Sequence, residues 1–486
     1  MAHDISAVSG STPQNVFTVE QHGLEPIPAS ERHGQPRNLL WTWLGGAYNY
    51  VALAAGALPI LFGLSLWHAL LAVVIGNLLG ALVFGLCAMH GPRTGTATIV
   101  NTRAAFGLKG NLLAAGISFF AVSGWVAVNS VFAASAIVGL LNVVGIPLNT
   151  AAHAVLVALV LLAQMIIAVY GYAMVMAAER IVAVVVGTLL TGVLVFVLPQ
   201  VNWAHPAAPE LAGSTTLGTW LLALGTMFAG PLSWANYASD YSRYLPADTD
   251  VRRVAFYSGL GMGVANVLGC FIGALLATLV DMSDPLANVP QVLPVWYTVA
   301  FMSAVLIGAL ANNVLNLYTA GLGLLALHVR APRWVAVVII GTIASVLTYV
   351  AIFGYNFMDL YAQFLLLTLV LLSPWVAILL VDFWLRRGRY QPIALHTWGR
   401  GPYWYRAGVN WPAVAIYLLG ILAALAFSNP NLWTNPIAVN LLGGADISLF
   451  VGFALTGALY YLVQRRLRGA ARDDAALTIE QSAGTA

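Results

Sequence analysis

Charged residues are scarce in this chain of 486 residues: only 8% are Asp, Glu, Lys or Arg, whereas 60% are hydrophobic. A soluble domain typically carries about 25% charged residues, so this sequence has too little polar surface to face water on all sides. Long apolar runs between short polar joints predict helices that cross a bilayer, because a helix satisfies its own backbone hydrogen bonds in lipid. We therefore expect an all-α integral membrane protein whose surroundings are the lipid bilayer.

Cysteine and the motifs of soluble enzymes are scarce as well. Cys87 and Cys270 both fall inside apolar runs, which favours inert packing residues over a disulfide, a metal site or a nucleophile. The sequence has no Gly-x-x-x-x-Gly-Lys-Ser/Thr phosphate loop, no His-Glu-x-x-His zinc pair and no Gly-x-Ser-x-Gly elbow. We expect no enzyme activity, no metal and no cofactor.

Apolar runs of transmembrane length occur twelve times. Every Lys and Arg lies on a tail, on alternate joints between these runs or, for Arg180, at the beginning of a run, and positive charge on short loops marks the cytoplasmic side. We predict a multi-pass protein of the cell inner (plasma) membrane, with cytoplasmic tails at 1–38 and 465–486 around a twelve-span domain at 39–464. The predicted spans are 39–62, 66–89, 111–141, 151–170, 176–199, 218–237, 254–280, 294–327, 334–354, 357–381, 412–427 and 445–464.

No joint is basic enough to form a polybasic cluster, so we expect the basic residues to set orientation and not to bind nucleic acid. No obligatory protein partner is evident. No predicted span carries Lys, Arg, Asp or Glu near its middle. Charge at the bilayer centre costs at least about 2.5–3.5 kcal/mol and normally marks an ion path or a charged ligand. Its absence argues against a voltage sensor and against a carrier that uses a side-chain counter-ion.

Other membrane functions are disfavoured on similar grounds. A channel would favour a continuous polar stripe or a charged ring, and a membrane-embedded enzyme would need a buried cluster of His, Asp and Glu; neither is visible. The polar side chains at membrane depth are amide and aromatic, which suits an uncharged polar substrate.

Two predicted spans contain helix-breaking residues. In span 6, Gly230-Pro231 removes a backbone donor and places the proline ring against the preceding turn. Span 1 contains Gly45, Gly46, Gly56 and Pro59. Interrupted helices at corresponding places in two halves indicate the midplane site of a transporter. Spans 1 and 6 are five apart, as two inverted five-span repeats require, although a purely structural kink is the alternative for span 6.

Amides and an indole mark two further spans. Trp125 and Asn129 are four residues apart in span 3, so they share one helix face. In span 8, Asn312 and Asn316 share a face in the same way, next to Asn313. Interhelical hydrogen bonding is the simple explanation for any one Asn. Together, however, an amide offers a donor and an acceptor to a heterocycle edge, and an indole offers a face for stacking.

Specific motifs recur from residue 20 to about span 10, and with them the chain resembles the nucleobase–cation symporter family, specifically its purine–cytosine permease branch. The motifs are Glu20-x-x-Gly23-Leu24-x-Pro26-Ile27-Pro28-x-x-x-Arg32, Gly91-Pro92-Arg93-Thr94-Gly95 with Arg103 and Gly107, Gly124-Trp125 with Asn129, Trp234-Ala235-x-Tyr237-Ala238-x-Asp240-Tyr241-Ser242-Arg243-Tyr244-Leu245-Pro246, and Asn312-Asn313-x-x-Asn316-Leu317-Tyr318.

The resemblance implies a leucine-transporter-like fold of two inverted five-helix repeats plus two extra helices, with alternating access around a central site. It implies a symporter domain that imports nucleobases such as cytosine or purines. Substrate-binding residues implied by the family are Trp125 and Trp234 as a clamp, Asn129 and Asn316 on the polar edge, Asn312 and Asn313 beside them, and Ser233 and Gly230 where span 6 unwinds. A related heterocycle (allantoin, hydantoin, or a vitamin pyrimidine or pyridine) and a substrate-sensing receptor on the same fold remain alternatives.

One departure from the family concerns the coupling ion. Sodium-coupled relatives place hydroxyl ligands about one turn before the substrate-binding Asn of span 8, where this chain has Leu310 and Ala311. Loss of two oxygen ligands favours H+ over Na+ as the coupling cation. Glu179 and Asp359, near span ends, are candidate proton carriers.

Overall fold

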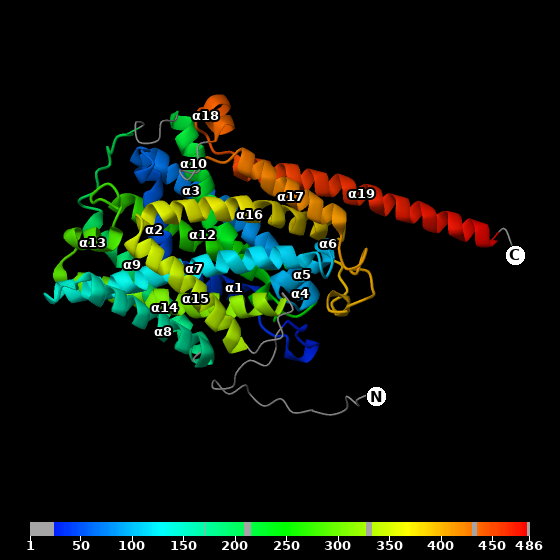
Figure 1. Cartoon of the computed structure of the whole chain (residues 1–486), viewed down its shortest axis with the longest axis horizontal. Coiled ribbons are helices and arrows are strands. Elements are labelled where there is room, and N and C mark those ends of the chain that lie inside the picture. Colours follow the sequence, from blue (N-terminus) through cyan, green and yellow to red (C-terminus); the bar gives the residue numbers. More distant parts are fainter. Residues whose placement is uncertain (1–23, 171, 209–214, 327–332, 430–434, 484–486) are drawn as a thin grey trace.

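The structure, a computed structural model, describes residues 24–170, 172–208, 215–326, 333–429 and 435–483. Within these ranges the regular structure is helical apart from one isolated bridge between Arg406 and Val409. The expectation of an all-α protein is confirmed. Figure 1 shows the long helices packed into one bundle, with the C-terminal part of α19 projecting from it.

The helices follow the predicted apolar runs in chain order. The longer ones are α1 (Pro36–Ala47), α2 (Tyr50–Leu61), α3 (Leu66–Ala88), α7 (Asn111–Val143), α8 (Thr150–Tyr170), α9 (Tyr172–Val197), α10 (Thr216–Ser233), α12 (Val251–Leu276), α14 (Val295–Ala326), α15 (Arg333–Phe353), α16 (Phe357–Leu385), α17 (Trp411–Ala426) and α19 (Ser448–Ala483). Short helices lie in the joints: α4 (His90–Thr94), α5 (Thr98–Asn101), α6 (Arg103–Phe106), α11 (Ala238–Ser242), α13 (Pro285–Asn288) and α18 (Pro436–Leu442).

Several helices meet the demands of a lipid bilayer. In the described part of the chain, six are long and apolar enough to cross it: Leu66–Thr94, Asn111–Val143, Thr150–Ala168, Val251–Leu276, Val295–Leu317 and Phe357–Leu385. The pair α1 and α2 is apolar enough when taken together and is bent by 67°. Large apolar side chains face outward, among them Leu71, Leu78 and Leu82 on α3, which are 50%, 52% and 58% exposed. Such an outer face suits lipid tails.

Close packing inside the bundle depends on small residues of α12. A Cβ added to Gly273 would overlap the carbonyl oxygen of Leu53, and one added to Gly269 would lie 2.8 Å from the Cβ of Ala52. Both neighbours belong to α2, so the two helix backbones approach within reach of direct contact. Small residues allow such an approach, and helices in membranes associate through van der Waals packing of this kind.

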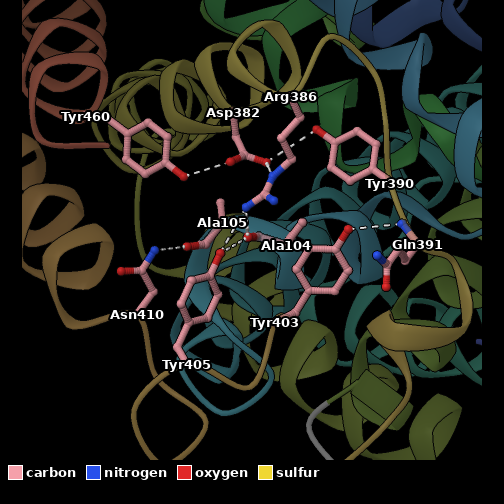
Figure 2. Close-up of polar contacts among 10 residues, drawn as sticks. All are labelled: Ala104, Ala105, Asp382, Arg386, Tyr390, Gln391, Tyr403, Tyr405, Asn410 and Tyr460. Atoms are coloured by element: carbon pink, nitrogen blue, oxygen red, sulfur yellow. Dashed lines mark hydrogen bonds and ion pairs between the residues drawn. The ribbon is translucent and has the colours of Figure 1, made fainter. Parts of the chain in front are cut away.

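A buried ion pair ties together one end of the bundle (Figure 2). Asp382 on α16 is 1% exposed, and it accepts hydrogen bonds from Arg386 Nε at 2.7 Å and from the Tyr460 hydroxyl of α19 at 3.0 Å. The Arg386 guanidinium also donates to the Ala104 carbonyl at 2.7 Å and to the Tyr405 hydroxyl at 2.9 Å. This network therefore joins α16, α19, α6 and the segment that follows α16.

The same end of the bundle holds a second set of contacts between the joint after α3 and the segment 386–410. Asn410 Nδ2 donates to the Ala105 carbonyl at 2.7 Å, and Arg103 Nη1 donates to the Leu395 carbonyl at 3.0 Å. Burial lowers the pKa of Arg103 to about 10. This value is still well above neutral pH, so the side chain stays cationic there. The two joints, which are 292 residues apart at Arg103 and Leu395, thus pack on each other at this end of the bundle.

Removing Asp382 should leave the Arg386 charge buried without its carboxylate. We expect Asp382→Ala to lower the free energy of unfolding by about 3–5 kcal/mol, as measured by thermal or denaturant unfolding of the purified protein in detergent. The matched control is Arg253→Ala, which breaks the exposed Arg253–Asp250 pair (3.7 Å) and should cost less than about 1 kcal/mol. Equal losses in the two variants would contradict the role assigned to the buried pair.

Candidate functional site

Span 1 is broken between α1 and α2, close to Gly45 and Gly46 as predicted, whereas Pro59 lies inside α2. Asn49 lies in the break and caps α2, because its side-chain oxygen accepts from Val51 N at 2.9 Å and Ala52 N at 3.4 Å. The Gly46 carbonyl near the end of α1 accepts from Asn49 Nδ2 at 3.2 Å and from Asn312 Nδ2 of α14 at 3.1 Å. Helix ends leave unpaired carbonyls and amides, and here two asparagines supply the missing partners.

Span 6 is also interrupted, but not where the sequence predicted. The α-helix α10 continues through Gly230-Pro231 to Ser233, and a 3-10 helix (Trp234–Tyr237) and α11 follow. The expectation that span 6 unwinds around Gly230 is therefore wrong. The physical reason is that a proline near a helix end removes one backbone bond only, while the Ser233 hydroxyl donates to the Gly230 carbonyl at 2.6 Å and supports the last turn.

Side-chain amides of α14 form hydrogen bonds with residues at both breaks. The Tyr237 hydroxyl, just after the break in span 6, donates to Asn316 Oδ1 at 2.9 Å. Asn316 Nδ2 donates in turn to Asn312 Oδ1 at 3.1 Å, and Asn312 binds Gly46 at the break in span 1. A continuous chain of hydrogen bonds therefore joins the two interrupted spans through one helix face of α14.

A cavity of about 30 Å³ lies between these breaks. An apolar cavity of about 150 Å³ holds benzene, so this one cannot admit a heterocycle until its walls move apart. Its lining comes from both broken spans and from α3, α7, α12, α14 and α16: Ala47, Asn49, Val51, Ala52, Ala55, Asn77, Trp125, Asn129, Thr226, Met227, Gly230, Trp234, Asn266, Cys270, Asn312 and Tyr361.

Five of the residues singled out in the sequence line this cavity: Trp125, Asn129, Gly230, Trp234 and Asn312. The indole of Trp125 meets the rings of Phe364 and Tyr361 at interplanar angles of 78° and 76°. The indole of Trp234 meets those of Trp43 and Tyr237 at 73° and 49°. In the part of the chain that the structure describes, neither indole is thus covered by a parallel ring.

Two polar atoms at this cavity are buried without a partner, Trp125 Nε1 and Asn129 Oδ1. Asn129 Nδ2 donates to the Trp125 carbonyl at 2.9 Å and to Asn312 Oδ1 at 3.3 Å. A buried polar group without a hydrogen bond costs about 1–3 kcal/mol. One donor and one acceptor are therefore available to a polar ligand.

Three residues singled out in the sequence lie outside the cavity lining: Ser233, Asn313 and Asn316. Successive residues of an α-helix are about 100° apart, so Asn313 points away from Asn312 and donates to Val126 O, Ser130 Oγ and Gln164 Oε1 at 3.0–3.1 Å. Asn316 binds Tyr237 and Asn312 as described above. The Ser233 hydroxyl turns back to its own helix, toward Gly230.

Sequence reasoning missed other lining residues. Asn49 could have been found as the helix cap after Gly45-Gly46, since Asn is a preferred N-cap. Asn77 on α3 and Asn266 on α12 are single amides in apolar runs and give no periodic signal. Thr226 and Tyr361 likewise resemble ordinary helix residues, so the fold alone reveals them.

The residues considered for ion coupling that the structure describes lie away from the cavity lining. Leu310 and Ala311, in the turn before Asn312 on α14, carry no side-chain oxygen, and neither lines the cavity. Asp359 is exposed in the first turn of α16. The side chain of Glu179 lies outside the described part of the structure.

Sequence comparisons identify relatives along almost the whole chain. Residues 26–452 match the family model described as permease for cytosine/purines, uracil, thiamine, allantoin. A putative purine-cytosine permease of Bacillus subtilis is 28% identical over 459 residues, which cover 92% of this chain and 96% of that protein. The purine-cytosine permease FCY21 of Saccharomyces cerevisiae is 23% identical, with 92% of this chain and 86% of the relative covered.

A comparison with solved structures supports the same grouping at the level of the fold. The transporter Mhp1, described as a nucleobase-cation-symport-1 family member and solved closed with bromovinylhydantoin bound, superimposes with a TM-score of 0.74. Identity is 18%, and 92% of this chain and 96% of that chain are covered. The chain therefore belongs to the nucleobase–cation symporter family, a family of membrane permeases and not of enzymes.

Proposed function

We propose that this protein is a secondary active transporter that imports nucleobases such as cytosine or purines across the inner (plasma) membrane, driven by a cation gradient. The observation that carries the proposal is the cavity between the two broken spans, where two indoles and five asparagine amides meet. Discontinuous helices around a central site are the usual construction of transporters that work by alternating access.

The lining supports a role for each of several residues. Trp125 and Trp234 clamp the flat heterocycle, since their faces are free of parallel rings. Asn129 Oδ1 accepts from a substrate N–H, and Trp125 Nε1 donates to a substrate acceptor. Asn312 shapes the same wall, whereas Asn316 positions Asn312 and Tyr237. The small volume requires the breaks to separate before a base enters.

Helix packing supports two inverted five-span repeats plus two extra spans, twelve in total. Under a shift of five spans, the packing of α2 on α12 (spans 1 and 7) corresponds to that of α10 on α3 (spans 6 and 2). The pair α1 and α9 (spans 1 and 5) likewise corresponds to α10 and α16 (spans 6 and 10). Equivalent contacts in both halves are what a pseudo-two-fold axis in the membrane plane requires.

The positions of the joints support cytoplasmic termini. The basic joint with α4, α5 and α6 lies toward the same end of the bundle as the C-terminal end of α19, and α13 lies at the opposite end (Figure 1). The joint with α13 carries Asp281 and Asp284 and no Lys or Arg. Basic joints on one side and acidic joints on the other agree with the positive-inside rule.

A related heterocycle is the second candidate substrate. A vitamin B6 transporter of Saccharomyces cerevisiae is 25% identical over 341 residues, covering 65% of this chain and 57% of that protein. A hydantoin permease of Microbacterium maritypicum is 30% identical over 198 residues, 39% of each chain. A competition panel of cytosine, adenine, hypoxanthine, uracil, hydantoin and pyridoxine against labelled uptake in cells separates these candidates.

Removing either indole should abolish uptake without preventing insertion. Trp125→Ala and Trp234→Ala remove stacking that is worth about 1–3 kcal/mol per base, so uptake of labelled cytosine or adenine in cells should fall at least about fivefold. Phe variants should be milder, because a ring face remains. Exposed Trp67, 63% exposed on α3, supplies the control variant Trp67→Ala. Normal uptake by both indole variants at normal membrane levels would contradict the clamp.

Uptake should follow a proton gradient and not a sodium gradient, since Leu310 and Ala311 offer no hard oxygen ligand for a small cation. The measurement is accumulation of labelled base in proteoliposomes with an imposed pH gradient, with choline in place of sodium. We expect accumulation to survive choline and to collapse with a protonophore. Accumulation that tracks sodium and ignores the pH gradient would contradict proton coupling.

A further inference from the structure

Asn77 and Asn266 form a second polar wall of the cavity, on a different helix pair from Asn129 and Asn312. Asn77 belongs to α3 and Asn266 to α12, and these two helices pack on each other. They are spans 2 and 7, which are again five apart. Neither residue belongs to the family motifs found in the sequence, and neither has a role in the mechanism described so far.

The hydrogen bonds of these amides fix which atom is free for a ligand. Asn77 Nδ2 donates to the Val73 carbonyl at 2.8 Å, and Asn266 Nδ2 donates to the Met262 carbonyl at 3.0 Å. An amide nitrogen carries two N–H groups; the second one of Asn266 donates to Met262 Sδ at 3.1 Å, and that of Asn77 donates to the Cys270 sulfur. The side-chain oxygen of each is then the atom left for other partners.

Local contacts place these oxygens at the cavity. A Cβ built on Gly230 would lie 3.6 Å from Asn266 Oδ1, so this oxygen reaches the last turn of α10, one turn before Trp234. The Cys270 thiol and the Asn77 side chain share a hydrogen bond. Asn77 Nδ2 donates this bond to the sulfur with its second N–H, so its oxygen keeps both lone pairs for other partners.

Asn129 repeats the same arrangement, since its Nδ2 binds the Trp125 carbonyl and its Oδ1 is unpartnered. Three helices thus present amide oxygens to one cavity. Such a surface matches a ligand with several N–H donors. An exocyclic amino group supplies two donors, whereas the keto group that replaces it supplies none.

We propose that Asn77 and Asn266 accept hydrogen bonds from the substrate and select amino-substituted bases over their keto counterparts. The inference rests on the proposed nucleobase transport and names the preferred substrate class within it. Cytosine is therefore favoured over uracil, and adenine over hypoxanthine. Within each pair the ring size is the same. The amino group of the first base is replaced by a keto group in the second, and the neighbouring ring nitrogen gains a hydrogen.

The test is isothermal titration calorimetry of the purified protein in detergent with these four bases, in choline buffer. We expect each amino base to bind at least about fivefold more tightly than its keto counterpart, since a lost hydrogen bond at a buried acceptor has that effect or more. The ratio should fall toward one in Asn77→Ala and Asn266→Ala. Asn266→Thr should retain part of it, because a hydroxyl can donate to the Met262 carbonyl and still accept.

The matched control is Asn313→Ala, which removes an equally buried amide outside the cavity and should leave the ratio unchanged. Equal or tighter binding of the keto bases by the unmodified protein would overturn the inference without any variant. So would a ratio that both Asn77→Ala and Asn266→Ala leave unchanged. If none of the four bases binds while hydantoin or pyridoxine does, the proposed nucleobase function itself fails, which is a distinguishable result.

Discussion

Hydrogen bonds from α14 to two broken spans are the contacts around which the rest of the site is arranged. A break in a membrane helix leaves backbone groups without water, and each must find a partner inside the protein. Asn312 provides one for Gly46, and Asn316 binds Tyr237 after the second break. Because Asn312 and Asn316 also bind each other, a shift of either broken span against α14 disturbs the contacts of the other.

The cavity and the network at the end of the bundle differ in how strongly their contacts hold the helices together. The network of Asp382, Arg386 and Tyr460 fixes α16, α19 and the neighbouring joints through an ion pair and hydrogen bonds to a buried carboxylate. The cavity is bordered instead by single amide bonds and by atoms without partners, Trp125 Nε1 and Asn129 Oδ1. Opening the cavity therefore costs few contacts compared with opening the end of the bundle. The proposed transport cycle needs such a difference, because the volume of about 30 Å³ has to increase for a substrate to enter.

Much of the fold followed from the sequence, because apolar length and helix-breaking residues act locally. Helices occupy the predicted apolar runs, and the break in span 1 was foreseen from Gly45 and Gly46. The break in span 6 lies at Trp234 and not at Gly230, because a proline in the last turn is compatible with an α-helix up to Ser233. Residue spacing put Trp125 and Asn129 on one helix face, and the family resemblance added Asn312 to the same pocket; all three line the cavity. It could not place Asn77 or Asn266, since a single amide in an apolar run has no partner in sequence and is located only by tertiary packing.

Counterflow in proteoliposomes tests the central claim, that the cavity between the breaks belongs to a carrier of nucleobases. Vesicles are loaded with unlabelled cytosine or adenine, and entry of the same labelled base is measured without an ion gradient. The account predicts faster entry into loaded vesicles than into empty ones, and loss of that acceleration in Trp125→Ala. A channel would show entry that does not depend on base inside the vesicle, and a receptor would show binding without entry. Either result would contradict the account.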